Sequence, residues 1–469
     1  MSMYIKFLDI LDRAHTGEVC KLKDWDLKVI AGKVREKLKE HGLLKTLDIK
    51  NPINTDDGLA DEFWKAGFEL AVEVGMLCMS TDRVIKFTEE ELRQCINDAP
   101  DEMKLGGGKD SFKVVTRKPS DGKHISPWLG AFGIALDENL YIPVTMANAQ
   151  YKVIDATIPG TLKTIYGRPI RSRTPYETLG GNYEARLQRE ALKAINRPMM
   201  TAQGGCSAPT EYGNFGGVGV PGGADPKNNL NVALATSELK TDYTLLHKVA
   251  HFMNCETYVY GGHFSFIGGF AGPPEGAALT SIAAACLLVP AHQASFQYVP
   301  CLNTRDASNS GRETVWASSV SAQAISRNTH LLPGGVVNPV SGPGTEMLLQ
   351  EVTVSAMNAG VSGYSFCEGV RSAGGRYANY TSGLENKYAA EVMKASTGID
   401  RELANEIVNE LIPKFEDKLM SPPIGVPFTE CFDLATLQPK KEWKELYDKY
   451  CEFLLDRGVD LSKAYLPSS

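Results

Sequence analysis

The sequence predicts an α/β protein whose centre is a (β/α)8 TIM barrel. From about residue 126 onward, short apolar segments typical of buried strands alternate with turn residues and Ala-rich helical runs, at the spacing of successive β-α units. Two less regular segments, residues 140–145 and 162–165, bring the number to the eight that close a barrel. Glycine-rich stretches follow many strands rather than one switch point, which disfavours the runner-up, an open doubly wound sheet. The clearer strands are centred on residues 199–202, 232–235, 257–260, 296–300, 330–332 and 362–366.

The composition is that of a cytoplasmic globular protein. Of 469 residues, 22% are charged and 43% hydrophobic, and the net charge of −7 offers no basic surface for nucleic acid. The N-terminus lacks a signal-peptide pattern, and the most apolar helical stretch, residues 279–289, ends at Pro290 and is too short to cross a membrane. The ten cysteines form no C-x-x-C pair, so we expect reduced thiols.

The barrel is expected to carry helical segments at both ends. Residues 1–125 are predicted to form an N-terminal helical extension, residues 126–400 the catalytic barrel, and residues 401–469 a C-terminal helical segment packed on it. Thr88 and Glu91 have the spacing of a capping box, which predicts a helix from there to about Ala99.

Residues 197–225 are predicted to form a strand followed by a long glycine-rich loop. Loops of this length inside a compact domain are usually functional or disordered, so we expect this one at the mouth of an active site. Residues 217–222 match G-x-G-x-x-G by letter. Pro221 and the glycines after it oppose the helix that a dinucleotide site needs, and we therefore assign no nucleotide.

Side chains at the carboxyl ends of the barrel strands are the candidates for the active site. In a barrel these positions face the mouth, whatever the chemistry. Each residue alone is better explained by structure than by catalysis, but together they describe a polar mouth. The set is Gln203, Cys206, Glu238, His263, Phe264, Asn303, Arg305, Asn338, Cys367 and Glu368.

Two metal sites are conceivable from the residue types. His247 and His251 are four residues apart, but no glutamate follows His247, and we leave this pair unassigned. Three strand ends carry cysteine, and together with a histidine or glutamate they can form a zinc site that activates a thiol or an alcohol. Cysteine is equally a small buried hydrophobe. The residues of this alternative are Cys206, Cys301 and Cys367 with His263 or Glu368.

Aromatic residues gather near the same strand ends. Aromatic faces around a cavity suit a quaternary or methylated ammonium group, at about 0.5–2 kcal/mol for each good contact. Packing alone also explains aromatic residues at strand ends. The residues are Tyr212, Phe215, Phe264, Tyr364 and Phe366.

Motifs in the same order along nearly the whole chain resemble a known family, the monomethylamine corrinoid-protein methyltransferases of methanogenic archaea. None of them is a catalytic signature by itself, but their order and spacing make coincidence implausible. They include Leu11-Asp12-Arg13-Ala14, Asp24-Trp25-Asp26-Leu27, Lys65-Ala66-Gly67-Phe68-Glu69, Lys86-Phe87-Thr88-Glu89, Thr174-Pro175-Tyr176-Glu177, Arg197-Pro198 with Gln203-Gly204, Glu238-Leu239-Lys240, Gly268-Gly269-Phe270-Ala271-Gly272, Arg312-Glu313-Thr314, Thr345-Glu346-Met347 and Phe428-Thr429-Glu430-Cys431-Phe432-Asp433.

The resemblance implies a homo-oligomeric barrel that moves a methyl group from a methylated amine to the Co(I) corrinoid of a separate carrier protein. It implies no tightly bound cofactor and no metal in the chain itself. In the family the barrel mouth holds pyrrolysine, whereas here Ala208 occupies that position. A glutamate and a glutamine that flank pyrrolysine in the family fall near Gly262 and Val336, so the resemblance names no catalytic residue.

These replacements favour a donor other than monomethylamine. A primary amine donor holds its methyl group on a poor leaving group and needs an adduct, whereas a quaternary ammonium donor releases a neutral tertiary amine after desolvation and alignment. We therefore expect a quaternary or otherwise activated donor, and for a betaine Arg305 or Arg312 is the candidate partner of its carboxylate. Two alternatives stay open: a zinc-dependent methyltransferase for a thiol, sulfide or alcohol, and a non-catalytic barrel that serves as a binding subunit.

Overall fold

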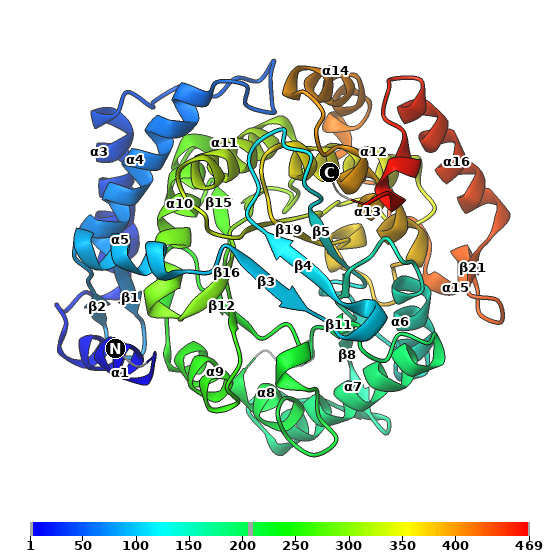
Figure 1. Ribbon diagram of the computed structural model, residues 1–469, viewed down its shortest axis with the longest axis horizontal. Helices are drawn as coiled ribbons and strands as arrows, with labels where there is room; N and C mark the ends of the chain where they lie inside the picture. Colours follow the sequence, from blue (N-terminus) through cyan, green and yellow to red (C-terminus); the bar gives the residue numbers. More distant parts are fainter. Residues whose placement is uncertain (1–2, 205–209, 468–469) are drawn as a thin grey trace.

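The computed structural model describes residues 3–204 and 210–467, and eight parallel strands form its centre (Figure 1). Neighbouring strands along the chain are neighbours in the sheet, and the last, β19, pairs with the first, β5. A single parallel bridge between Ala202 and Asn229 joins the remaining two edges. The predicted (β/α)8 barrel is therefore confirmed. Its strands are β5 (Ser126–Leu129), β7 (Ala156–Thr157), β11 (Thr201–Ala202), β12 (Val232–Ala235), β14 (Val259–His263), β16 (Ala294–Tyr298), β18 (Pro333–Val336) and β19 (Phe366–Gly369).

The predicted first two strands were wrong. Residues 140–145 lie in and before helix α6 (Tyr141–Ala149), and residues 162–165 belong to short strands outside the barrel, β8 (Thr161–Leu162) and β9 (Thr164–Ile165). The true strands β5 and β7 have four and two residues, too few to show an alternating pattern, and β5 contains Pro127. Strands β18 and β19 begin later than expected, at Pro333 and Phe366.

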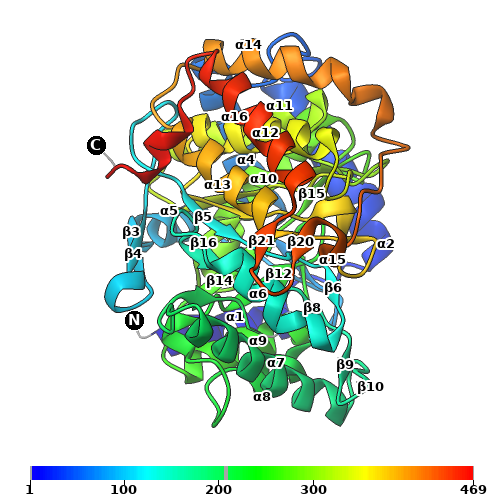
Figure 2. The ribbon, with the colours of Figure 1, turned by 90° about the vertical axis from the view of Figure 1, so that its right-hand side faces the viewer.

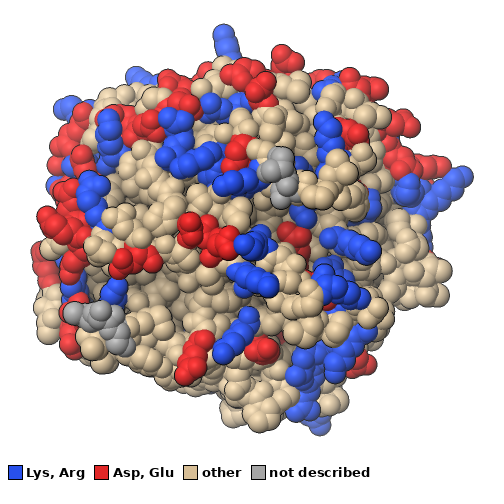
Figure 3. Space-filling view, in the orientation of Figure 1, with Lys and Arg blue, Asp and Glu red and all other residues tan. Residues whose placement is uncertain are grey.

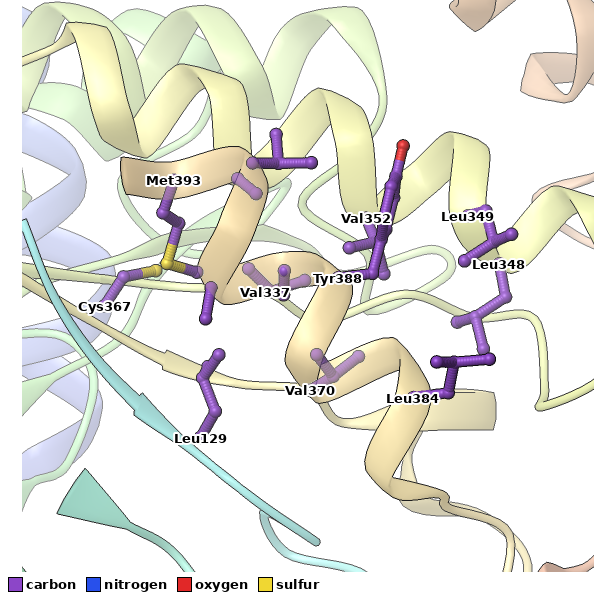
Figure 4. Close-up of a cluster of buried hydrophobic side chains, with 14 of the residues drawn as sticks. Leu129, Val337, Leu348, Leu349, Val352, Cys367, Val370, Leu384, Tyr388 and Met393 are labelled. Carbon is purple, nitrogen blue, oxygen red and sulfur yellow. The ribbon is translucent and has the colours of Figure 1, made fainter. Parts of the chain in front are cut away.

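Alternate residues of each strand point to opposite sides of the barrel wall. On β19, Phe366 belongs to the buried cluster inside the barrel, whereas Cys367 belongs to the cluster between the barrel and its outer helices. Figure 4 shows this outer layer, in which the Cys367 sulfur lies beside Met393 of helix α13 (Gly383–Ala395) and Leu129 of β5 lies nearby. Strand β19 thus contributes to two separate cores.

A β-hairpin closes the amino-terminal end of the barrel. Strands β3 (Glu102–Leu105) and β4 (Phe112–Val115) lie across this end in Figure 1, and Leu105 and Val114 are buried in the same cluster as Trp128. In Figure 2 the hairpin lies on one side of the molecule, and the short strands β6 (Ala135–Leu136), β8 and β15 (Ser265–Ile267) lie on the other. A ligand therefore has to approach from the carboxyl ends of the strands.

Helix α10 (Pro274–Ala291) is the one helix among the described residues with the length and composition of a membrane span. It includes Pro290, where the sequence was expected to end it, and continues to Ala291. It lies inside the protein, and 94% of its apolar window is buried, as in the core helix of a globular domain. The other helices that follow barrel strands are α7 (Pro175–Ala194), α8 (Glu211–Gly217), α9 (Tyr243–Asn254), α11 (Arg312–Asn328) and α12 (Glu346–Val361).

Helices at both ends of the chain pack on the barrel. Helix α5 (Glu89–Asp98) starts with the predicted capping box, formed by Thr88 and Glu91. At the other end, the indole of Trp443 donates to Ser382 Oγ before α13, at 2.9 Å. The three-part division at about residues 125 and 400 stays a prediction. The remaining elements are α1 (Met3–Thr16), α2 (Leu22–Asp24), a π-helical turn (Trp25–Ile30), α3 (Ala31–Glu40), α4 (Asp57–Val74), β1 (Met76–Cys78), β2 (Arg83–Ile85), β10 (Arg168–Pro169), β13 (Lys240–Thr241), β17 (Cys301–Asn303), α14 (Arg401–Leu411), α15 (Phe428–Cys431), β20 (Phe432–Asp433), β21 (Gln438–Pro439) and α16 (Lys441–Leu455).

Charges of both signs are spread over the face that carries the hairpin. Figure 3 shows Lys and Arg side chains among Asp and Glu side chains, without a single sign covering this face. The distribution gives this face no continuous basic surface of the kind that binds a nucleic-acid backbone.

Candidate functional site

Aromatic rings fill the inside of the barrel. Trp128 of β5 stacks on Phe366 of β19 with ring centroids 4.0 Å apart, and its edge contacts Phe296 of β16 at 5.3 Å. Toward the carboxyl ends of the strands, Tyr260 and Tyr298 follow, with centroids 5.7 Å apart. The rings come from four strands, and in each strand every second residue faces the barrel interior.

Glu368 lies among these rings with its carboxyl group buried. Its side-chain Oε1 and the hydroxyl groups of Tyr260 and Tyr298 have no hydrogen-bond partner outside this cluster among the described residues. Burial raises the pKa of Glu368 to about 8, and the two phenols, which face the carboxyl group as hydrogen-bond donors, act in the opposite direction. Three buried polar groups that have only one another as partners indicate a binding site.

Asn338 adds a further acceptor at the end of the neighbouring strand. Its Nδ2 donates to the carbonyl oxygen of Ala307, and its backbone N–H donates to Asn309 Oδ1 at 2.9 Å. Its Oδ1 is buried without a partner in the part of the chain that the structure describes. Val336, two residues earlier, faces the barrel interior in the same cluster as Phe366.

Glu238 and His263 lie near the mouth but are engaged elsewhere. His263 Nε2 accepts the backbone N–H of Leu239 at 3.0 Å, and burial lowers the pKa of His263 to about 3, so the ring is neutral. Burial raises the pKa of Glu238, while the backbone N–H of Ala271 and the charge of Lys240 act against this shift. His263 therefore holds the turn that carries Glu238, and within the described residues no hydrogen bond or ion pair joins either group to Glu368.

Four of the predicted residues lie outside the barrel interior. The Tyr364 hydroxyl donates to the carbonyl oxygen of Ser318 in α11, and Cys367 packs against Met393 in the outer layer. Tyr212 is an exposed residue of α8. Arg312, at the start of α11, donates to the side chain of Asn409 and to a backbone carbonyl near the surface.

The remaining predicted residues have mixed positions. Phe264 packs edge-on against Tyr298, with centroids 5.4 Å apart, and so belongs to the aromatic site. Arg305 is largely exposed and forms an ion pair with Glu313 at 2.9 Å. The backbone carbonyl of Gln203 accepts Gln188 Nε2 at 2.6 Å. Cys206 and Ala208 lie outside the described residues.

A cavity of about 500 Å³ lies at the surface beside the start of α11. Asn303, Arg305 and Arg312 line it together with Glu416 and Met420. It is separate from the aromatic site, because none of the inward-facing rings lines it. These polar residues thus line a surface cavity and are not part of the aromatic site in the barrel interior.

The structure offers no support for the two metal hypotheses. No group of three His, Cys, Asp or Glu side chains able to hold a metal ion occurs within residues 3–204 and 210–467. Cys367 and Glu368 point to opposite sides of the barrel wall. His247 lies 3.5 Å from Glu211, whereas His251 contacts the carbonyl oxygen of Val218.

The glycine-rich segment after β11 is not a continuous loop. It contains the short helix α8, which ends at Gly217, where the nucleotide-like motif begins. Gly219 and Gly222 have positive φ values, 71° and 81°, and no α-helix starts inside the motif. The prediction that this motif holds no dinucleotide fits that geometry.

Three residues of the site were missed from the sequence: Tyr260, Tyr298 and Arg371. Both tyrosines lie at inward positions of predicted strands, so the two-residue period of a strand contained the signal. Arg371 follows β19 by two residues and lies within electrostatic reach of Tyr298. No local pattern distinguishes such an arginine.

The comparisons with known proteins identify the family. A family model described as monomethylamine methyltransferase MtmB matches residues 5–459. The chain belongs to this family. Monomethylamine methyltransferase MtmB3 of Methanosarcina barkeri is 32% identical over 454 residues, which cover 96% of this chain and 97% of the relative. MtmB1 of Methanosarcina acetivorans is 30% identical over 452 residues, with the same two shares.

Solved structures of the MtmB family have the same fold. The crystal structure of the Methanosarcina barkeri monomethylamine methyltransferase superposes with a TM-score of 0.92 at 30% sequence identity, and the match covers 96% of this chain and 98% of that one. A crystal structure of a hydroxylamine MtmB complex gives the same values. The resemblance inferred from the motifs is thereby confirmed, and with it the barrel.

Proposed function

We propose that this chain is a corrinoid-dependent methyltransferase that works without pyrrolysine on a small methylated ammonium donor, in the first place a quaternary one. The acceptor is the Co(I) corrinoid of a separate partner protein, and the chain itself binds no cofactor tightly. It acts in the cytoplasm as a homo-oligomer. The relatives' name, monomethylamine methyltransferase, supports the reaction class.

The observation that carries the proposal is the Glu368 carboxyl group, which is buried in an aromatic enclosure without a cation beside it among the described residues. A buried carboxylate without a cation is unstable, which is why the pKa of Glu368 rises to about 8. A bound ammonium supplies the missing charge and shifts this pKa down again. Aromatic faces add about 0.5–2 kcal/mol for each good contact with the cation.

The polar groups of this interior lie beside the positions where the resemblance places the family's glutamate and glutamine. Gly262 is paired in register with Tyr298 on the next strand, and Val336 is paired with Glu368. A side chain at Gly262 has no room, because its Cβ would lie 2.6 Å from Leu234 and 3.1 Å from the Tyr298 ring. Tyr298 and Glu368 therefore supply the polarity that positions 262 and 336 lack.

The protein residues contribute binding, orientation and exclusion of water. Glu368 and the rings hold the ammonium, and the closed amino-terminal end leaves its methyl groups directed toward the mouth. The corrinoid of the partner supplies the nucleophile: the methyl–nitrogen bond breaks, the methyl group goes to cobalt, and the electron pair remains on nitrogen. A quaternary donor then leaves as a neutral tertiary amine and needs no proton from the protein.

A donor panel tests the proposal. The purified chain is incubated with a Co(I) corrinoid protein, and in parallel with free cob(I)alamin, and the absorbance spectrum reports corrinoid methylation. We expect methylation with at least one of tetramethylammonium, choline and trimethylammonioacetate, and none with monomethylamine. Methylation with monomethylamine alone, or with no donor in the panel, contradicts the proposal.

A further inference from the structure

Arg371 is anchored at the mouth of the barrel, two residues after β19 ends. Its backbone N–H donates to the carbonyl oxygen of Val337 at 3.1 Å, next to the end of β18. Its guanidinium lies against two glycines of mouth loops, Gly133 and Gly375. A methyl group added to either glycine would come within 3.1 or 2.7 Å of the Arg371 Nε. These glycines leave the space that the arginine side chain occupies.

Among the described residues the guanidinium of Arg371 makes no hydrogen bond and no ion pair, although the residue is partly buried. Arg117 shows the usual solution for a buried arginine, because its guanidinium donates to the carbonyl oxygens of Tyr364 and Gly360 and lies 3.2 Å from Asp121. An arginine offers five N–H donors in a fixed fork, so an arginine without acceptors in a mouth is prepared for an anion.

The positive charges around Arg371 also favour a bound anion. Burial is the main cause of a lowered pKa of Arg371, and the positive charge of Arg376 lowers it further. Arg376, on the same loop, donates to the backbone carbonyl oxygen of Asp306 at 3.2 Å. The two positive charges repel each other, and a bound anion relieves that repulsion.

Tyr298 is influenced both by Arg371 at the mouth and by Glu368 in the barrel interior. Its pKa is raised well above the ordinary value, first by burial and then by the Glu368 charge, while the Arg371 charge acts in the opposite direction. The pKa of Tyr298 therefore depends on both Glu368 and Arg371.

We propose that Arg371 binds the carboxylate of a zwitterionic methyl donor, an N-methylated ammonium carboxylate whose ammonium group lies at Glu368 and the aromatic rings. This inference rests on the proposed function and narrows its substrate class. It replaces the sequence-based candidates for the carboxylate, because Arg305 is paired with Glu313 and Arg312 with Asn409 and Glu416.

The test compares two probes that share a trimethylammonium group, trimethylammonioacetate with a carboxylate and choline with a hydroxyl group. Calorimetric binding to the full chain needs no corrinoid protein. We expect trimethylammonioacetate to bind about tenfold more tightly than choline to the parent. Arg371→Gln should remove this preference and leave choline affinity within about twofold. Arg371→Lys should retain part of it, because an ammonium keeps the charge but not the bidentate geometry.

The control variant is Arg457→Gln, which removes an arginine from the exposed ion pair with Glu410 and should change neither affinity. Circular dichroism confirms that each variant is folded. Equal weakening of both probes by Arg371→Gln overturns the inference. An unchanged preference for trimethylammonioacetate in that variant also overturns it. The same holds if the parent shows no preference and Arg371→Gln loses only methyl transfer to the corrinoid protein, because Arg371 then contacts the partner protein.

The outcome can be separated from that of the proposed function. If trimethylammonioacetate binding depends on Arg371 but no donor methylates a corrinoid, the proposed reaction fails while the carboxylate site stands. If corrinoid methylation occurs with choline and tetramethylammonium, and Arg371→Gln does not change the relative affinities for trimethylammonioacetate and choline, the reaction stands and the carboxylate site fails.

Discussion

The two sides of strand β19 differ in how their buried groups are satisfied. On the outer side, Cys367 contacts aliphatic and thioether side chains, and the nearby Glu385 carboxyl accepts hydrogen bonds from Ser382 and Ser372. On the inner side, Glu368 is equally buried, but its Oε1 has no partner within the described chain. Both sides exclude water. Only the inner side leaves charge and hydrogen-bonding capacity for a ligand.

This difference separates what stabilises the barrel from what acts on a substrate. Burial raises the pKa of both carboxyl groups, that of Glu385 to about 7 and that of Glu368 to about 8. A raised pKa alone therefore does not identify a functional residue. The partners distinguish the two groups: Glu385 accepts hydrogen bonds from Ser382 and Ser372 that hold the start of α13, whereas Glu368 faces two phenols that have no other partner among the described residues.

Glu368→Gln should have the largest effect. The amide preserves the shape but not the charge, so a bound ammonium loses its buried counterion, which costs about 3–5 kcal/mol. We expect the rate of methyl transfer at low donor concentration to fall at least about 100-fold, measured by corrinoid absorbance. The fold should persist, since the parent already has an unsatisfied group at this position.

Glu385→Gln is the matched control on the outer side. Glutamine also serves at the third position of a capping box, so the start of α13 is retained. Its transfer rate per folded molecule should stay within about twofold of the parent. If the two variants lose the same activity, the distinction between the sides of β19 is lost.

The sequence predicted the architecture better than the site. Strand β12 was placed with its correct bounds because its four residues lie between clear turn signals, whereas β5, Ser-Pro-Trp-Leu, has no recognisable period. Glu368 was found because it stands at a strand end. Its neighbour Cys367 was included for the same reason, although strand alternation already sends the two side chains to opposite sides.

The rest of the site depends on properties that no short sequence pattern contains. Tyr260 and Tyr298 are as common in a satisfied core as in a pocket, and only their unpartnered hydroxyl groups distinguish them. Arg371 is notable for the carboxylate it lacks, whereas Arg305 and Arg312 have partners from the Glu313 and Glu416 segments. Pairing of this kind is decided by the packed structure.

The pH dependence of stability should show the Glu368 carboxyl directly. Its folded-state pKa of about 8 exceeds its ordinary value of 4.5, so between these values the folded state keeps a proton that the unfolded state has released. The contribution of the Glu368 carboxyl to stability is thus fully present below pH 4.5 and is lost as the pH rises toward 8. From pH 6 to 7.5 this group should lower the free energy of unfolding by about 2 kcal/mol.

Denaturant unfolding of the parent and of Glu368→Gln measures this contribution, because all other titrating groups are shared. Over this range the free energy of unfolding should fall more steeply with pH in the parent than in the variant, by the slope that corresponds to about one proton. Saturation with a quaternary ammonium should reduce the difference, since the cation favours the ionised carboxylate. Identical slopes without ligand would show that Glu368 is ionised at neutral pH and needs no cation.

Cys367→Ala should have the smallest effect, and it tests the outer side of the strand. The substitution removes one sulfur atom from contact with Met393, which should lower the free energy of unfolding by about 1 kcal/mol. Burial raises the pKa of Cys367 well above its ordinary value, so the thiol is neutral and a poor metal ligand in this environment. The rate of methyl transfer per folded molecule should therefore equal that of the parent. A loss of activity larger than about tenfold, together with zinc in the parent that is missing from the variant, would instead place Cys367 in the metal site that the zinc-dependent alternative requires.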